Sequence, residues 1–391
     1  MLNTPFSPWP CFSEEEAEAV TRVLLSNKVN YWNGQEGHEF EKEFAAWVGS
    51  KYALAVANGT VALETALRAL NIGTGDEVIV TPRTYFASVS SIVAVGAIPI
   101  FADVDADSQN ITVRTIAEVL SPRSKGIICV HLAGWPCDMD EIMTFASEHG
   151  LYVVEDCAQA HGARYKGRSV GSFGHIGAWS FCQEKIMSTG GEGGMITTND
   201  KALWERAWSY KDHGKSFDRV FNTNHTIGFR WFQGSFGTNG RLTELQSTIG
   251  RFQLKRMPEW SQKRRANSKK ISEVCTTFSS LRVPQVPSYV DHAYYKHYVF
   301  VRPDQLKQNW TRDQIMTEVN QLGVPCYTGG CPEVYLEKAF DETDWRPKKR
   351  LPIAKELGET SLMFLVHPTL KELEVDKTCK AIKEVMKVAS L

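Results

Sequence analysis

The sequence has no cysteine pairs or clusters of the kind that build disulfide frameworks or zinc sites. Its nine cysteines are scattered over 391 residues, with no Cys-x-x-Cys pair and no Cys/His group at zinc spacing. We therefore expect no bound metal ion. Reduced thiols are typical of a cytoplasmic protein, and we expect that location.

An excess of either charge is also missing. Lysine and arginine together number 44 and aspartate and glutamate 45, for a net charge of -1, which is too little to hold a nucleic-acid backbone. The densest basic run, QKRRANSKK at residues 262–270, is expected to form a solvated helix face. The opening MLNTPFSPWP lacks the regions of a signal peptide, and no uninterrupted apolar run reaches membrane-spanning length. Neither nucleic acid nor membrane is expected as a partner.

What the sequence does contain is a regular alternation of short apolar runs with helical patterns. The apolar runs predict strands at residues 52–57, 77–81, 98–102, 126–131, 151–155, 176–182 and 194–198. Helices are predicted between them at residues 61–70, 87–95, 113–120 and 140–149. Right-handed crossovers would cover both faces of the sheet, so the pattern predicts an α/β fold with a mostly parallel sheet.

The flanking segments predict a large domain and a smaller one. SEEE at residues 13–16 is typical of a capping box that begins a helix, and a long helix is expected to begin near Arg241. Residues 211–236 are polar and aromatic without clear periodicity, which favours a functional or interface loop. We expect a large domain over residues 1–250 and a small C-terminal α+β domain over residues 251–391.

Ligands of open parallel sheets bind at the carboxyl ends of the strands, and two such ends suggest phosphate and ring binding. In the turn ANGT at residues 57–60, backbone N–H groups are able to approach a phosphate, although an Asn-Gly helix cap explains the turn equally well. Tyr85 follows the strand at 77–81 and is suited to stacking on a flat ring, although tyrosines in such places are often part of the core.

Two further strand ends carry ionisable side chains. Asp156 follows the strand at 151–155, where it either caps the next helix or keeps a pyridine nitrogen protonated. Lys185 follows Ser180 and precedes the glycine-rich loop TGGEGG at residues 189–194. A lysine in this position is an ordinary surface residue if exposed, whereas a buried one can form a Schiff base with an aldehyde.

The order of these features resembles that of the DegT-type nucleotide-sugar aminotransferases, which have the aspartate aminotransferase fold, fold type I among pyridoxal-phosphate enzymes. The resemblance covers nearly the full length. It rests on GQEGHEFEKEFAAWVG, NGTVAL, GDEVIVTPRTYFAS, VEDCAQAHGARYKGRSVG, SFCQEKIMSTGGEGG and FGTNGRLTELQSTIGRFQL. The chain departs from the family at Cys182, where relatives often carry His, Phe or Asn, and at residues 366–368, which lack the usual Leu-Pro run.

The resemblance implies that the chain binds pyridoxal 5'-phosphate. Gly59, Thr60 and Ser180 would hold its phosphate, and Tyr85 would stack on its ring. Asn239 would reach the phosphate from the neighbouring subunit, so the active sites would be shared within a homodimer.

The resemblance also assigns the reacting groups. Asp156 would pair with the pyridine nitrogen, Gln159 would lie near the phenolic oxygen of the ring, and Lys185 would form the Schiff base. A dehydrating branch of the family has His in place of this lysine, so Lys185 argues against that branch. Arg241 is a candidate for a substrate carboxylate or phosphate, with an ion pair at a helix start as the alternative.

The activity implied is transfer of an amino group from an amino acid, by resemblance L-glutamate, to a nucleotide-linked keto sugar. We expect a 4-keto-6-deoxyhexose in surface-polysaccharide biosynthesis. Residues 229–231 of the long loop could contact the nucleotide, but packing against the partner subunit is the favoured interpretation. Two other functions remain open at this point: another fold type I activity, such as an aldolase or a desulfurase, and a non-catalytic regulator that senses a ligand.

Overall fold

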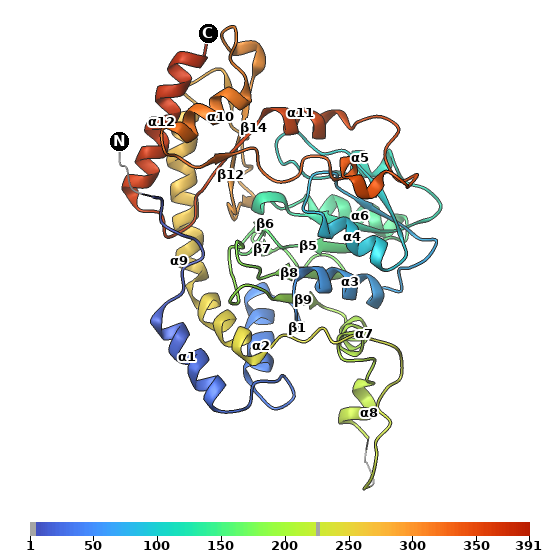
Figure 1. The fold of residues 1–391 in the computed structure, drawn as a ribbon. Helices are drawn as coiled ribbons and strands as arrows, with labels where there is room; N and C mark the ends of the chain where they lie inside the picture. The colour runs from blue at the N-terminus through green and yellow to red at the C-terminus, as the bar shows by residue number, and fades with distance from the viewer. Residues whose placement is uncertain (1–4, 224–226) are drawn as a thin grey trace.

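Figure 1 shows the computed structural model of the chain, which describes residues 5–223 and 227–391. Its centre is a seven-stranded sheet in the order β1-β9-β8-β5-β4-β2-β3. The strands are β1 (Tyr52–Val56), β2 (Glu77–Val80), β3 (Ile98–Phe101), β4 (Ser124–Val130), β5 (Tyr152–Asp156), β8 (Ile176–Ser180) and β9 (Gly194–Thr198). The predicted strands are all present, with ends that differ by one or two residues.

The sheet is mostly parallel, as the sequence predicts. β3, β2, β4, β5 and β8 pair in parallel, whereas β9 runs antiparallel to both of its neighbours, β8 and β1. Because β9 is antiparallel, β1 points the same way as the parallel strands. The carboxyl ends of β1, β2, β5 and β8 therefore lie along one edge of the sheet.

Helices cover both faces of this sheet. On one face lie α3 (Gly59–Ala69), α4 (Ala87–Ala94) and α7 (Lys201–Lys211), and on the other lie α2 (Glu36–Val48), α5 (Val113–Ala117), α6 (Met139–Glu148) and the first half of α9 (Glu244–Cys275). Strand β1 shows how alternation divides the core. Leu54 and Val56 pack under α3, while Ala53 and Ala55 pack under α2.

The C-terminal region builds a second core on the far half of α9. An antiparallel sheet contains β10 (Leu281–Arg282), β12 (His297–Val301), β14 (Ser361–Phe364) and β13 (Cys326–Tyr327), and it packs with α10 (Arg312–Gln321) and α12 (Glu372–Ala389). Helix α11 (Pro352–Thr360) packs toward the large sheet instead. A small third sheet joins β11 (Val290–Asp291), β6 (Arg164–Tyr165) and β7 (Arg168–Ser169).

The two cores share one helix. Leu254 and Met257 of α9 belong to the core of the large sheet, whereas Ile271 and Val274 belong to the C-terminal core. The predicted division at residue 250 therefore falls inside a continuous helix, and the two-domain description stays a prediction.

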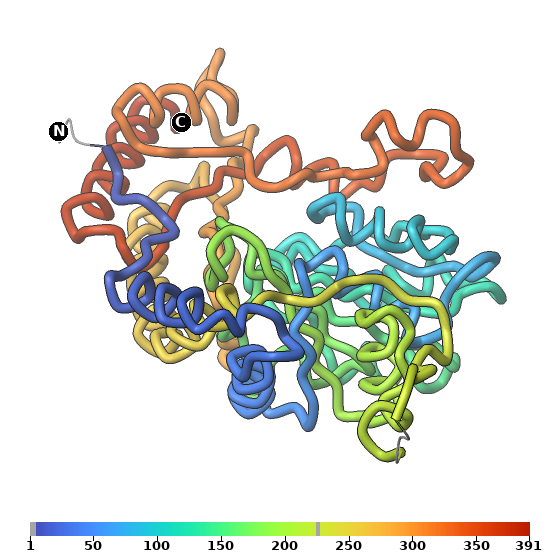
Figure 2. Tube along the Cα trace, turned by 60° about the horizontal axis from the view of Figure 1, so that its bottom comes forward, coloured from blue at the N-terminus to red at the C-terminus, as the bar shows by residue number. Residues whose placement is uncertain are grey.

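The N-terminal segment crosses between the two cores. Ser13 and Glu16 form the predicted capping box at the start of α1 (Glu14–Leu25), which packs on α9. Before it, Ser7 donates from its backbone N–H to Glu374 Oε1 of α12 at 2.6 Å. Figure 2 shows this segment running beside α12 and α9, so it connects the C-terminal core to the elements around the large sheet.

The basic run at residues 262–270 lies in α9 and differs in part from the expectation. Most of its side chains are exposed, but Arg264 and Ser268 are buried, with Arg264 only 1% exposed. The run therefore forms a largely solvated helix face in which two residues are buried, because α9 has packed neighbours on more than one side.

The loop at residues 211–236 projects from the body of the molecule (Figure 1). It includes α8 (Phe217–Phe221), and residues 224–226 within it lie outside the described part of the chain. Phe229, Trp231 and Phe236 are exposed. Within the described residues, none of the helices combines the length and the apolar character needed to cross a bilayer.

We expect Gly250→Ala to destabilise the junction between α2 and α9. A Cβ at this position would lie 2.5 Å from Cζ of Phe40, a fully buried ring, and overpacking of this kind costs about 1–3 kcal/mol. The gain in helix propensity only partly offsets the clash. Thermal unfolding followed by circular dichroism measures the loss, with Lys269→Ala on the exposed face of α9 as the control. An unchanged melting temperature for Gly250→Ala would contradict this packing.

Candidate active site

A cavity of about 500 Å³ opens at the carboxyl ends of β1, β2, β5 and β8. The structure brings together there the predicted site residues Gly59, Thr60, Tyr85, Asp156, Gln159, Ser180 and Lys185. Asn239 and Arg241 do not line it.

One end of the cavity has hydrogen-bond donors suited to an anion. Asn58 caps α3 by accepting from the backbone N–H of Val61 at 2.9 Å. The first N–H groups of a helix have no partner within the helix, so those of Gly59 and Thr60 remain for a ligand, at the positive end of the helix dipole. Ser180 is so close that a Cβ on Gly59 would lie 2.6 Å from its Cβ. Only glycine fits here.

Strand β9 brings these two segments together. Gly194 pairs with Val56 of β1 on one side and with Ser180 of β8 on the other. A Cβ on Gly194 would lie 2.5 Å from the carbonyl oxygen of Asn58. The absence of a side chain at this position allows the turn after β1 to approach the end of β8.

The carboxylate of Asp156 lies at the end of β5 and is 5% exposed. Its Oδ2 accepts from the Ser88 hydroxyl at 2.7 Å, and its Oδ1 accepts from the backbone N–H of Ala158 at 3.1 Å. The Thr84 hydroxyl lies 2.8 Å from that of Ser88 and supports it in turn. These bonds fix the carboxylate while leaving lone pairs directed at the cavity.

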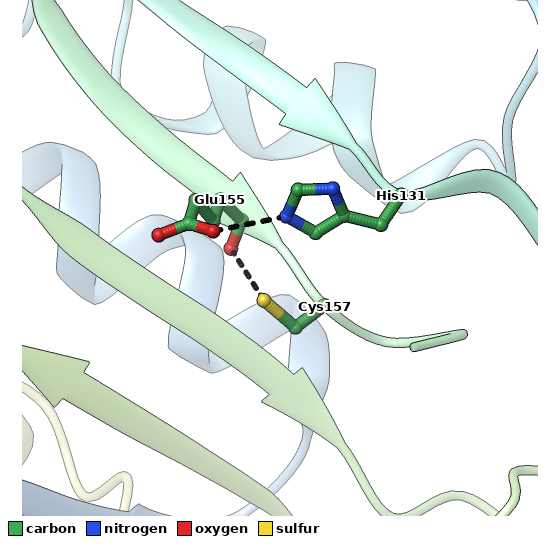
Figure 3. Close-up of side chains that lie close together, drawn as sticks. All are labelled: His131, Glu155 and Cys157. Carbon is green, nitrogen blue, oxygen red and sulfur yellow. Dashed lines mark hydrogen bonds and ion pairs between the residues drawn. The ribbon is translucent and has the colours of Figure 1, made fainter. Parts of the chain in front are cut away.

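The preceding residue, Glu155, anchors β5 on the opposite face of the sheet. Figure 3 shows His131, Glu155 and Cys157 lying together. Both oxygens of Glu155 are occupied: Oε2 interacts with His131 Nε2 at 3.0 Å and Gly171 N–H at 2.8 Å, and Oε1 accepts from the backbone at residues 173 and 174. Burial opposes ionisation of this carboxyl, but the hydrogen bonds from His131 and the backbone hold its pKa below the usual value.

This cluster is a structural anchor. His131 Nδ1 accepts from the backbone N–H of Cys137 at 3.0 Å, which leaves Nε2 as the protonated nitrogen that donates to Glu155. A metal ion would need a free lone pair at that nitrogen. The bonds instead fix the end of β5, and with it the position of Asp156.

Lys185 contributes the amine of the cavity. It follows β8, and Trp9 Nε1 donates to its carbonyl oxygen at 2.9 Å. Burial lowers the pKa of the ammonium, while the charge of Asp156 acts in the opposite direction. Its Nζ lies 5.4 Å from the centre of the Tyr295 ring. Such an environment favours the neutral amine, the form that attacks carbonyl carbon.

Gln159 and Tyr85 complete the wall. The backbone N–H of Ala133 donates to Gln159 Oε1 at 2.8 Å, so the amide NH₂ group of Gln159 remains as a donor toward the cavity. Tyr85 is 71% exposed and lines the cavity mouth. The alternative that Tyr85 belongs to the core is therefore wrong.

Asn239 and Arg241 lie on the strand-like segment between the projecting loop and α9. Asn239 is exposed and forms a β-bridge with Asp212. Arg241 Nη1 forms an ion pair with Asp212 Oδ1 at 2.9 Å, which agrees with the ion-pair alternative for Arg241. Their predicted roles toward cofactor and substrate stay predictions.

Sequence reasoning missed several residues of the cavity. Ser88 could have been predicted to lie near the cavity, because it follows Tyr85 by one helical turn in the segment TPRTYFAS. Tyr295 could not have been, because it enters from a loop before β12, far along the chain.

The residues present fit pyridoxal phosphate. The cavity begins at the N-terminus of α3, which is suited to a phosphate, and it contains the carboxylate of Asp156 and the amide of Gln159. It also contains the amine of Lys185, whose pKa is lowered by burial. The glycine at position 59 is required for the close approach of α3 to Ser180, where a phosphate would lie.

Comparison with known proteins agrees with this site. The sequence profile of the DegT/DnrJ/EryC1/StrS aminotransferase family matches residues 10–383. The chain belongs to this family. It is a family of pyridoxal-phosphate-dependent aminotransferases, and the chain is accordingly a sugar aminotransferase acting on nucleotide sugars.

Individual relatives align with almost the whole length of the aminotransferase. The chain is 34% identical to the GDP-perosamine synthase of Escherichia coli O157:H7, over 96% of each chain. An aminotransferase structure from Psychrobacter cryohalolentis is 61% identical with a TM-score of 0.97, covering 98% of this chain and 99% of that one. The S. venezuelae DesV structure, in complex with a ketimine intermediate, is 30% identical with a TM-score of 0.84, covering 95% and 94%. The predicted family, fold and enzyme class are confirmed.

We expect Glu155→Ala to destabilise the aminotransferase by about 3 kcal/mol or more, because it leaves the buried His131 and three buried or part-buried backbone N–H groups without an acceptor. Differential scanning calorimetry measures the effect, with the exposed Glu148→Ala as the control. A variant as stable as the parent would show that the anchor does not hold β5.

Proposed function

We propose that the chain binds pyridoxal 5'-phosphate through Lys185 and transfers an amino group from L-glutamate to a nucleotide-linked 4-keto-6-deoxyhexose. One observation carries the proposal: the amine of Lys185 and the carboxylate of Asp156 face the same cavity, which begins at the N-terminus of α3. We expect the amino-sugar product to be used in surface-polysaccharide biosynthesis.

The cofactor would be held at both ends by residues of this chain. The N–H groups of Gly59 and Thr60 and the Ser180 hydroxyl would donate to its phosphate. Asp156 would accept the N–H of its pyridine ring, Gln159 would donate to its phenolic oxygen, and Tyr85 would cover the ring. When bound, the cofactor supplies an electron sink for the carbanion formed on loss of the Cα proton.

Lys185 would act both as the attachment point and as the proton carrier. Once the amino donor had taken its place on the cofactor, its amine would be free to accept a proton from the Cα of the donor. The lowered pKa favours the neutral form that accepts the Cα proton. The same nitrogen would return that proton during amination of the keto sugar, so one residue serves both halves of the reaction.

The nature of the acceptor is proposed from similarity. GDP-perosamine synthase, one relative of the chain, is named for a nucleotide-linked amino sugar. L-glutamate is proposed as donor because it is the amino donor implied by the family resemblance.

We also propose that the active unit is a homodimer with shared sites. Asn239 is exposed and lies outside the cavity of its own chain, and the adjacent loop exposes Phe229 and Trp231. Burial of these rings against a partner subunit, with Asn239 reaching that subunit's phosphate site, would account for both features.

Lys185→Ala is expected to abolish amino transfer, since none of the other proposed cofactor-binding residues has an amine to bond the cofactor covalently and move the proton. Production of 2-oxoglutarate from L-glutamate, together with absorbance of the bound cofactor, measures both losses. The exposed Lys201→Ala serves as the control. Retention of full activity by Lys185→Ala would refute the assignment.

Asp156→Asn is expected to reduce kcat by about 100-fold or more while leaving the melting temperature nearly unchanged, because an amide keeps the volume but no longer stabilises a positive charge on the ring nitrogen. Steady-state kinetics and calorimetry on the same preparation separate the two effects. Asp140→Asn, at an exposed position, is the control. Unchanged turnover would exclude the electron-sink role of Asp156.

A further inference from the structure

A second cavity, of about 570 Å³, adjoins the first on the side of the C-terminal core. The two share Tyr85, Gln159, Lys185 and Tyr295 as walls. Thr84 and Glu184 are also shared. Most of the remaining walls come from the N-terminal segment and from the C-terminal region, and they include Trp9, Lys296 and His367. A substrate joined to the cofactor at Lys185 would extend into this second cavity.

The wall of this cavity carries the basic side chains of Lys185, Lys296 and His367 and the acid Glu184. Burial, together with the charges of Arg264 and Lys185, lowers the pKa of Lys296 to about 8, although Glu184 acts in the opposite direction. Burial lowers the pKa of His367 to about 3, with Arg264 and Lys296 again contributing, so His367 is neutral. Two cations, Lys296 and Arg264, therefore lie within electrostatic reach of one another with Glu184 as the acid that faces Lys296.

Arg264 lies directly behind the wall and is incompletely partnered. Its Nη1 donates to the carbonyl oxygens of Tyr294 and Tyr295 at 3.4 and 3.3 Å, and its guanidinium lies 5.0 Å from the centre of a Trp9 ring. Its Nε and Nη2 are buried and have no hydrogen-bond partner among the described residues. A buried cation without a counter-ion is costly, and an anion in the adjoining cavity would offset that cost.

The position of Lys296 relative to Lys185 suits a small amino acid. Both amines lie beside the ring of Tyr295, whose centre is 5.1 Å from Lys296 Nζ and 5.4 Å from Lys185 Nζ. A donor whose nitrogen replaces that of Lys185 would place a carboxylate along the same ring, toward Lys296. Arg241, the other candidate for this carboxylate, already has Asp212 as its ion-pair partner.

We propose that Lys296 binds a carboxylate of the amino donor, with Arg264 behind it strengthening the positive field. The inference rests on the proposed amino-transfer function and names the residue that recognises the donor. Lys296 is thus a donor-binding residue of the second cavity.

The test compares the two half-reactions of the cofactor-loaded enzyme. Lys296→Met is expected to raise the KM for L-glutamate at least about tenfold, the factor that corresponds to loss of one charged hydrogen bond. The rate at which the enzyme, already converted to its amino form, aminates the keto sugar should change less than about twofold, because the donor is no longer bound in this half-reaction. Lys296→Arg should restore most of the affinity, and the exposed Lys387→Met should behave as the parent.

A binding measurement provides a readout independent of turnover. Calorimetric titration with glutarate, a dicarboxylate without an amine, should give weaker binding to Lys296→Met than to the parent. Comparison of L-glutamate with L-glutamine and L-alanine as donors locates the contact. An equal loss of affinity for all three donors indicates that Lys296 contacts the α-carboxylate. A loss of affinity for L-glutamate alone indicates that it contacts the side-chain carboxylate. Either result supports the site.

Two results would overturn the inference. One is an unchanged L-glutamate KM and unchanged glutarate affinity in Lys296→Met, and the other is a loss confined to the keto-sugar half-reaction. Failure of the parent enzyme to react with any amino donor is a different result, because it would contradict the proposed function itself.

Discussion

The site depends on a buried carboxylate held rigidly at the end of one strand. Asp156 is fixed from the cavity side by Ser88 and from the other face of the sheet by the bonds of its neighbour Glu155. Adjacent positions on a strand point to opposite faces, so one residue serves the chemistry and the next serves the anchor. Because β8 lies beside β5, the same anchor also fixes the direction from which Lys185 enters the cavity.

Much of this arrangement could be predicted from the sequence. The alternation of apolar runs gives a mostly parallel sheet, and in such sheets the carboxyl ends of strands meet at one edge. Asp156 and Lys185 follow predicted strands and Ser180 lies near the end of one, so their convergence follows from topology. Their detailed roles come from the resemblance to a known family, since Lys185 alone is indistinguishable from a surface lysine in the sequence.

Other features could not be predicted because they depend on packing between distant segments. Tyr295 comes from the C-terminal part of the chain, and Trp9 from the N-terminal segment, yet both contact Lys185. Arg264 lies in the run QKRRANSKK, where its neighbours Lys263 and Arg265 are exposed. Helical periodicity places Arg264 and Ser268 on one side of α9. The sequence does not show that this side is packed, because the segments that cover it come from distant parts of the chain.

The two cavities divide the work of recognition. The first has the features suited to a phosphate and a flat ring, and it is built on the ends of strands and the start of α3. The second lies between the large sheet, the N-terminal segment and the C-terminal core, with Lys296 on its wall and Arg264 buried behind Tyr295. Rigid elements thus hold the reacting groups, while substrate-facing residues come from loops, where variation changes specificity without disturbing the sheet.

The most direct measurement is to reduce the cofactor-loaded protein with sodium borohydride and map the modified peptide by mass spectrometry. Our account predicts that a single pyridoxyl group is attached to Lys185. Attachment to Lys296 or to a surface lysine instead, or no attachment at all, would contradict it.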